Sequence, residues 1–257
     1  MIIMILAVDA GNTHIVFGCI EDGKILNTFR IRTDAKQTDI EYAIKLNEIM
    51  DIAGVDAGRI DGAILSSVVP PLNKALTGAI RLITGAECMV VGPGMKTGLN
   101  VCIDDPGTLA GDLAVGSVAA MQYYGTPCII IDLGTATTVV AVDAKNRFLG
   151  GVIYPGVNLA YSALSSGTSL LPQISITPPP KAIGTNTVDC MRSGAVYGTA
   201  DMLDGTIARF EEEIGTKCKV VATGGLASSV VKYCRHEITC DDDLLLKGLW
   251  YLYNKNK

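Results

Sequence analysis

The sequence predicts an α/β protein built from a duplicated domain. Two stretches carry this prediction, "LAVDAGNTHIVFG" at 6–18 and "IIIDLGTATTVVA" at 129–141. Both run from apolar residues through Asp-x-Gly and back into apolar residues, and a constant offset aligns Asp9 with Asp132. A hairpin turn and a third apolar stretch follow in each half. One Asp-x-Gly turn is weak by itself, but two inside matching three-strand frames indicate a repeat.

After its three strands, the first half alternates helices and strands, which is typical of α/β layers. A helix is expected over 38–50, because Thr38 and Glu41 form a capping box. Its expected buried stripe consists of Ile40, Ala43, Leu46 and Ile49. The elements expected next are a buried strand, a helix and a strand, over 62–70, 72–83 and 88–94.

The second half ends differently from the first. An irregular, proline-rich stretch over 170–187 precedes a long helical run over 187–214, about 40 Å at 1.5 Å per residue. A helix of that length suits pairing with a twin in a dimer. The chain then closes with a strand, a Gly-Gly turn and a helix over 218–231, and with an amphipathic helix through Trp250. We expect one domain over 1–115 and another over 116–257.

Composition narrows the class of protein. The chain has 257 residues, is 49% hydrophobic and carries a net charge of −5, so we expect a packed globule with no nucleic-acid surface. The apolar run "MIIMILAV" is too short for a membrane span or a signal peptide. The eight cysteines include no C-x-x-C pair. They are expected to be reduced and mostly buried in a cytoplasmic protein.

The Asp-x-Gly turns point to a split nucleotide site. A turn that contains glycine lets main-chain N–H groups approach a phosphate, and Asn12, Thr13, Thr135 and Thr137 add side-chain donors. Carboxylates repel phosphate, so Asp9 and Asp132 are expected to hold a cation, either Mg²⁺ through water or a monovalent ion. Gly224 and Gly225 suit the close approach of an adenosine ring. The chain contains no P-loop motif.

Several motifs resemble those of one family in their order along almost the whole chain. They are "DAGNTHIV" (9–16), "VVGPGMKTGL" (90–99), "IDLGTATT" (131–138), "GGVIYPGV" (150–157), "NTVDCMRSGAVYG" (186–198), "ATGGLA" (222–227) and "DDLLLKGLWYLY" (242–253). The chain is identified by them as similar to type III pantothenate kinases, within the actin-like and sugar-kinase superfamily. This resemblance implies two ribonuclease-H-like domains with ATP in the cleft between them.

The resemblance also implies a reaction and its partners. Type III pantothenate kinases phosphorylate the primary hydroxyl of pantothenate with ATP, the first step of coenzyme A biosynthesis. They use Mg²⁺ and an activating K⁺ or NH₄⁺ ion, and they are homodimers whose interface completes the substrate site.

Roles carry over by position. The residues that the resemblance places along ATP are Asp9, Ala10, Gly11, Asn12, Thr13, His14, Ile15, Val16 and Thr135. Asp132 would bind the monovalent cation, Thr187 would contact pantothenate, and Asp112 falls on the catalytic base.

The chain departs from the family at its substrate motif. Where those kinases read Gly-x-Asp-Arg, this chain reads Ala110-Gly111-Asp112-Leu113. The Asp is kept, but Leu cannot replace the charge-assisted hydrogen bonds of the Arg. Besides a pantothenate kinase with an altered pocket, two alternatives stay open. One is a kinase of another small alcohol. The other is a catalytically weak paralog that binds nucleotide and acts in regulation or by pairing with another subunit.

Overall fold

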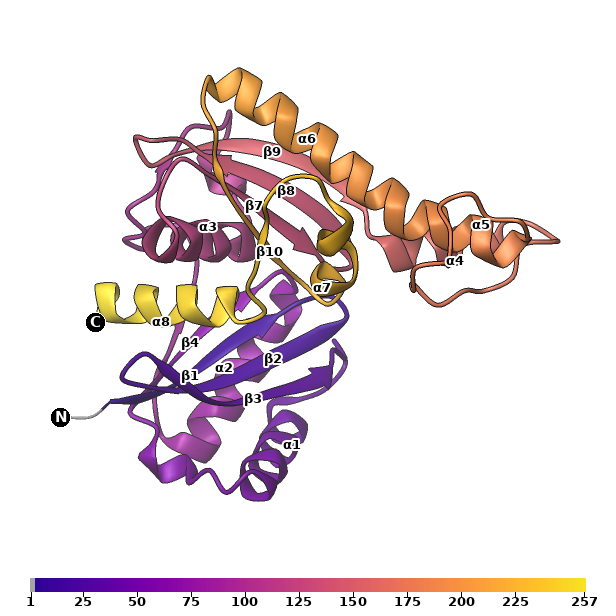
Figure 1. Cartoon of the computed structure of the whole chain (residues 1–257). Helices are drawn as coiled ribbons and strands as arrows, with labels where there is room; N and C mark the ends of the chain where they lie inside the picture. The colour runs from indigo at the N-terminus through magenta and orange to yellow at the C-terminus, as the bar shows by residue number, and fades with distance from the viewer. Residues whose placement is uncertain (1–2) are drawn as a thin grey trace. The chain divides into compact units, whose positions relative to one another are not determined.

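The computed structural model describes residues 3–257, which form two compact units (Figure 1). Unit 1 comprises the chain up to Gly98, Asp105–Ala119 and Leu244–Lys257, and unit 2 comprises Leu99–Asp104 and Ala120–Asp243. The C-terminal segment therefore packs with unit 1. The domain boundary expected between residues 115 and 116 stays a prediction.

The described part of unit 1 contains a five-stranded sheet in the order β3-β2-β1-β4-β5. Its strands are β1 (Met4–Ala10), β2 (His14–Glu21), β3 (Lys24–Arg32), β4 (Gly62–Ser67) and β5 (Cys88–Val90). The three opening strands pair antiparallel, as the sequence predicts, whereas β1, β4 and β5 pair parallel. The carboxyl ends of β1 and β4 consequently meet at one edge of the sheet.

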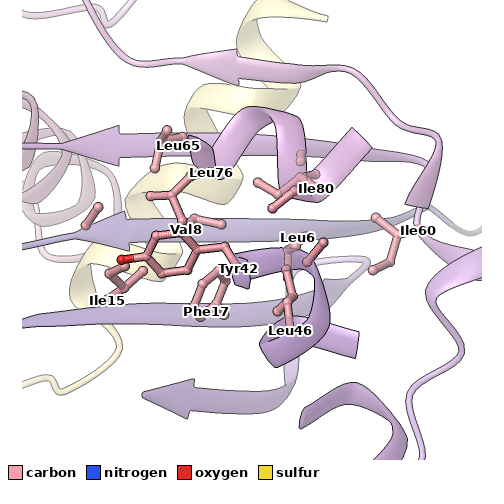
Figure 2. Packing of buried hydrophobic residues seen from close by; sticks show 14 of the residues in the cluster. Leu6, Val8, Ile15, Phe17, Tyr42, Leu46, Ile60, Leu65, Leu76 and Ile80 are labelled. Carbon is pink, nitrogen blue, oxygen red and sulfur yellow. The ribbon is translucent and has the colours of Figure 1, made fainter. Parts of the chain in front are cut away.

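Helices α1 (Asp39–Ile52) and α2 (Pro70–Thr84) cover one face of this sheet. Figure 2 shows Leu6, Val8 and Phe17 from the strands packed against Tyr42 and Leu46 of α1. The predicted capping box of α1 is present. Its predicted stripe is wrong in part, because Ile40 is exposed and Ile49 is only half-buried. The buried side chains are Tyr42, Ala43, Leu46 and Met50, so the buried stripe includes the large ring of Tyr42 in place of Ile40.

Helix α8 (Leu244–Asn256) covers the other face of the unit 1 sheet. Gly18 of β2 leaves room for Leu246, and Gly62 of β4 leaves room for Tyr253. Helix α3 (Gly111–Tyr123) belongs to unit 1 as far as Ala119, and it packs against α8 where Gly248 meets the carbonyl of Val115. The C-terminal helix α8 therefore belongs to the same unit as the first strands.

Unit 2 repeats the opening frame of unit 1. Its strands are β6 (Asn100–Val101), β7 (Cys128–Leu133), β8 (Ala136–Val142), β9 (Arg147–Pro155), β10 (Lys219–Thr223) and β11 (Thr239–Cys240). They form a sheet in the order β11-β10-β7-β8-β9-β6. The antiparallel β7, β8 and β9 followed by the parallel β10 match β1, β2, β3 and β4, so the predicted duplication of the three-strand frame is confirmed.

The predicted helix over 187–214 is continuous in the structure, but its backbone is α-helical in two parts and π-helical between them. It consists of α5 (Thr187–Ser193), a π-helical segment, η3 (Gly194–Gly198), and α6 (Thr199–Ile214). In Figure 1, α6 lies along the sheet, whereas α5 lies beyond its end beside α4 (Val157–Ser166). Two glycines bound the π segment, which accounts for the break in regular α geometry.

The proline-rich stretch has no helix or strand between α4 and α5, as predicted. Hydrogen bonds tie it to the helical path instead: Tyr197 Oη donates to the Pro179 carbonyl at 3.4 Å, and Arg192 Nη2 donates to Ser175 Oγ at 3.1 Å. The remaining short helices are η1 (Ala57–Arg59), η2 (Pro106–Thr108), α7 (Ala227–Val230) and η4 (Val231–Tyr233). Helices α3 and α4 were not predicted.

The structure bears on two expectations from composition, one on the cysteines and one on membrane-spanning helices. The cysteines are free thiols, but only Cys19 and Cys128 are buried, and Cys102, Cys190 and Cys240 are exposed, so the prediction that most are buried is wrong. Within residues 3–257, no helix combines the length and the apolar content needed to cross a bilayer.

Two helical glycines test the packing of α8. An added Cβ at Gly248 would lie 2.4 Å from the main-chain oxygen of Val115, whereas one at Gly205 of α6 would meet no atom within 4 Å. We therefore expect Gly248→Ala to lower the free energy of unfolding by about 1–3 kcal/mol. Gly205→Ala should raise it by about 0.5–1 kcal/mol, because Ala loses less backbone entropy in a helix. Urea unfolding measures both, and an equal effect of the two substitutions would contradict this packing.

Candidate active site

The turn after β1 presents polar groups at the edge of the unit 1 sheet. The Gly11 N–H donates to the His14 carbonyl at 3.0 Å, and Thr33 Oγ1 donates to the Gly11 carbonyl at 2.6 Å. These bonds close the turn and leave Asn12 and Thr13 exposed beside Asp9, which is half-buried. The turn therefore offers main-chain and side-chain donors next to a carboxylate.

The residues on either side of this turn differ in how far their side chains are exposed. The side chains of Ala10 and Ile15 are 1% and 0% exposed and belong to the core, whereas His14 is exposed and Val16 is half-buried. A ligand at this turn would therefore meet Ala10 and Ile15 through their main chain only. Of the predicted ATP-binding residues here, Asn12, Thr13 and His14 have exposed side chains, and those of Asp9 and Val16 are half-buried.

Parallel pairing brings a second strand end beside Asp9. Asp9 of β1 is in register with Ser66 of β4, a fully buried serine whose hydroxyl has no hydrogen-bond partner. The N-terminus of α3 approaches the same point, since a Cβ added to Gly111 would lie 3.3 Å from Ser66 Oγ. Unit 1 thus gathers Asp9, Ser66 and the start of α3 at one edge of its sheet. Sequence reasoning missed Ser66, although "SS" at the end of a predicted buried strand was an available signal.

The start of α3 carries the predicted base. Asp112 Oδ1 accepts a hydrogen bond from the Leu113 N–H at 2.8 Å. Burial raises the pKa of Asp112 above its usual value, and the N–H groups of Leu113 and of Asp112 itself oppose part of that rise. A half-buried carboxylate with a raised pKa is a better proton acceptor than an exposed one. Ala110 and Leu113, the two departures from the family motif, are half-buried beside it.

Unit 2 places Asp132 as unit 1 places Asp9. Asp132 is in register with Thr223 of the parallel strand β10, and Gly134, Thr135 and Ala136 of the following turn are exposed. A Cβ added to Gly224, whose φ is +95°, would lie 2.5 Å from Asp132 Oδ1. Main chain therefore lies close to this carboxylate because residue 224 is glycine. Gly225 meets no atom within 4 Å of an added Cβ, which leaves open space for a ligand.

The predicted substrate residue Thr187 lies elsewhere in unit 2. It is exposed and begins α5, where the side chain of Asn186 accepts a hydrogen bond from the Asp189 N–H at 2.9 Å. One turn further on, the Nε of Arg192 is buried and has no partner. Figure 1 shows α5 beyond the end of the sheet that carries Asp132.

The two carboxylates suit different cations. Among residues 3–257 no three His, Cys, Asp or Glu side chains gather as a metal site. Mg²⁺ commonly binds through one or two carboxylates plus phosphates and water, so the carboxylate of Asp9 fits that ion. Asp132 supplies a carboxylate oxygen beside the main chain of Gly224, and a ligand of that kind fits a hard cation.

A separate pocket of about 400 Å³ in unit 2 has its polar groups engaged with one another. Glu211 accepts hydrogen bonds from Lys217 Nζ at 2.6 Å and from the Cys218 N–H at 3.0 Å. His236 Nδ1 lies 2.7 Å from Asp204 Oδ1. The pocket reaches Lys219, which pairs with Cys128 at the opposite ends of the strands from Asp132. We regard these contacts as structural ones that hold the segment after η4 on α6.

Comparison with known proteins identifies the family. The sequence profile described as "Type III pantothenate kinase" matches residues 5–209. The chain belongs to the type III pantothenate kinase family. It is 40% identical to the type III pantothenate kinase of Halalkalibacterium halodurans over 253 residues, with 98% of this chain and 100% of the relative covered. It is 39% identical to that of Myxococcus xanthus, with 98% and 99% covered. The predicted family is confirmed.

Solved structures of distant relatives share the fold. Component A of (R)-2-hydroxyglutaryl-CoA dehydratase from Acidaminococcus fermentans superposes with a TM-score of 0.60 at 15% identity, over 99% of this chain and 100% of that one. The inorganic polyphosphate/ATP-glucomannokinase of Arthrobacter sp. superposes with a TM-score of 0.51 at 14% identity, over 98% and 99%. These similarities concern the fold alone, and they confirm the predicted fold class.

Proposed function

We propose that this family member transfers the γ-phosphoryl group of ATP to the primary hydroxyl of pantothenate, giving 4′-phosphopantothenate and ADP at the start of coenzyme A biosynthesis. The observation that carries the proposal is the placement of Asp112. Its half-buried carboxylate begins α3, which approaches the strand end occupied by Asp9 and Ser66 in the same unit. The carboxylate that we propose as the proton acceptor therefore lies in the same unit as the turn at 11–13, which we propose binds phosphate.

In the proposed reaction, Asp112 orients the attacking hydroxyl and accepts its proton. The hydroxyl oxygen forms a bond to the γ-phosphorus as the bond from that phosphorus to the bridging oxygen breaks, and ADP leaves with the electron pair. Because such transition states are loose, the hydroxyl must be positioned more than it must be deprotonated in advance. The raised pKa of Asp112 suits a group that takes the proton late.

We propose that Asp9 holds Mg²⁺ through water and that Asp132 holds K⁺ or NH₄⁺. These cations would neutralise the phosphate charge that develops during transfer. The N–H groups and side chains of the two turns, at 11–13 and 134–135, would bind phosphate oxygens, since both turns are exposed in part and contain glycine. Gly225 would border the adenosine ring, because the space beside it is open.

Leu113 is the observation that favours a second candidate. Without the family's Arg, a substrate carboxylate loses a charge-assisted partner. A kinase of a small alcohol that has no carboxylate would not need one. On pantothenate, we propose that Thr187 contacts the substrate and that the pocket near Leu113 is rebuilt with apolar surface.

We also propose that the chain is a cytoplasmic homodimer. Its free and partly exposed thiols suit a reducing compartment, which cell fractionation would test. Large apolar side chains are exposed around α4 and the proline-rich stretch, namely Ile153, Leu159, Leu164, Leu170 and Ile183. A contiguous exposed apolar patch is typical of subunit interfaces, and we propose that these side chains form one in the dimer.

The dimer can be tested at the two most exposed of these side chains. Leu170 and Ile183 are 90% and 84% exposed, and Leu170→Asp together with Ile183→Asp should convert a dimer to a monomer in light scattering at micromolar concentration. Ile52 of α1, which is 88% exposed, provides the control Ile52→Asp. A monomeric wild type that is fully active would contradict the proposed dimer.

The activity is tested with purified chain, Mg²⁺, ATP and pantothenate. We expect ADP and 4′-phosphopantothenate in equal amounts, and we expect Asp112→Asn to lower kcat by about 10²–10⁴-fold with nucleotide affinity unchanged. The acidic limb of kcat against pH should lie above the usual Asp range, because burial favours the protonated carboxyl and the base must be ionised.

Two control arms make this assay decisive. Na⁺ in place of K⁺ and NH₄⁺ should reduce the rate sharply, and equal rates in the three salts would remove the monovalent cation from Asp132. Turnover of other small alcohols with none of pantothenate would favour the second candidate. ATP binding without turnover of any alcohol would favour the paralog.

The departure from the family motif gives a gain-of-function prediction. Leu113→Arg, combined with Ala110→Gly for backbone room, should restore a charge-assisted hydrogen bond to the substrate carboxylate, worth roughly 1.5–3 kcal/mol. That corresponds to about a tenfold to hundredfold rise in kcat/KM for pantothenate. If kcat/KM does not rise in a double variant that folds as the wild type does, another part of the pocket already supplies the contact.

A further inference from the structure

Ser66 is fully buried, yet its hydroxyl has no hydrogen-bond partner. A buried hydroxyl without a partner is costly, and a role in catalysis is one of the explanations for such a group when it lies beside an active site. The serine is close to the proposed chemistry, because it is in register with Asp9 and because Gly111 lies against it. Its unused donor therefore calls for an explanation in the working enzyme.

The carboxylate of Asp112 accepts hydrogen bonds from main-chain groups and, among residues 3–257, from no side chain. The hydrogen bonds that oppose the rise in its pKa come from main-chain N–H groups at the start of its own helix, those of Leu113 and of Asp112. In this arrangement the carboxylate is folded back on α3. A carboxylate that accepts a proton from an incoming hydroxyl also needs a donor that fixes its orientation.

Gly111 connects the two groups. A Cβ at this position would lie 3.3 Å from Ser66 Oγ, a contact tighter than most side chains tolerate. The backbone directly before Asp112 can approach the serine because residue 111 is glycine. Asp112 follows Gly111 directly, so its side chain belongs to the segment of α3 that lies against the serine.

We infer that Ser66 is a positioning residue, whose hydroxyl donates to the Asp112 carboxylate when the nucleotide is bound and so aims it at the substrate hydroxyl. This inference rests on the proposed function, in which Asp112 is the base. Ser66 itself touches neither substrate nor nucleotide, because its side chain is fully buried. It acts only through Asp112.

The kinetic test compares Ser66→Ala with a matched control. Ser117 of α3 is also fully buried with an unpartnered hydroxyl, and Ser117→Ala should leave kcat within about twofold of wild type. Ser66→Ala should lower kcat by about tenfold to a hundredfold with KM for ATP unchanged. Ser66→Cys keeps the volume with a poor donor and should behave as Ser66→Ala does, whereas Ser66→Thr, which keeps the hydroxyl, should recover part of kcat.

A second readout does not depend on the acceptor alcohol. With Mg²⁺ and a non-hydrolysable ATP analogue, carbon-13 NMR of the side-chain carboxyls reports the titration of Asp112, assigned by its loss in Asp112→Asn. Loss of a donor to the carboxylate should raise the Asp112 pKa in Ser66→Ala but not in Ser117→Ala. An unchanged pKa and an unchanged kcat in Ser66→Ala would overturn the inference. A wild type that does not phosphorylate pantothenate would instead overturn the proposed function, and the titration would still decide the role of Ser66.

Discussion

Both units depend on one constraint, a parallel pair of strands. In unit 1 the first strand, β1, pairs with β4, and in unit 2 the corresponding strand, β7, pairs with β10. This pairing brings Asp9 level with Ser66 in unit 1 and Asp132 level with Thr223 in unit 2. The carboxyl ends of such strands have no further neighbours in the ladder, so polar side chains there can face a ligand. The antiparallel strand on the other side returns through a glycine turn, which adds main-chain donors to the same edge. A buried apolar sheet thus ends in a polar site in each unit.

The two units differ in what approaches that edge. In unit 1 the start of helix α3 approaches the strand end. This helix carries Asp112, and its first residue, Gly111, lies against Ser66. In unit 2 it is the main chain at Gly224, which lies against Asp132. In the proposed phosphoryl transfer, the carboxylate beside the unit 1 strand end accepts the proton and the carboxylate at the unit 2 strand end holds the monovalent cation.

Much of this arrangement could be predicted from the sequence, because it depends on local signals. The Asp-x-Gly turns, the hairpins of the three-strand frames and the Thr38 capping box all follow from short-range chemistry, and the structure contains each of them. Properties that depend on packing could not be predicted. The stripe of α1 shifted toward Tyr42, and the long helix loosened into a π segment between two glycines. The Ser66-Ser67 pair could be seen in the sequence, but the lack of a partner for the Ser66 hydroxyl depends on what surrounds it in space.

The account depends most directly on Asp9, the carboxylate at the first strand end. Single-turnover phosphoryl transfer from ATP to pantothenate by Asp9→Asn, at saturating Mg²⁺, is the most direct test, because Asn keeps the shape of the side chain and removes its charge. Asp22→Asn, in the exposed hairpin turn after β2, is the matched control. The account predicts that Asp9→Asn unfolds at the same urea concentration as wild type and transfers phosphate at least a hundredfold more slowly, while Asp22→Asn is unaffected. A folded Asp9→Asn protein with the wild-type rate would contradict it.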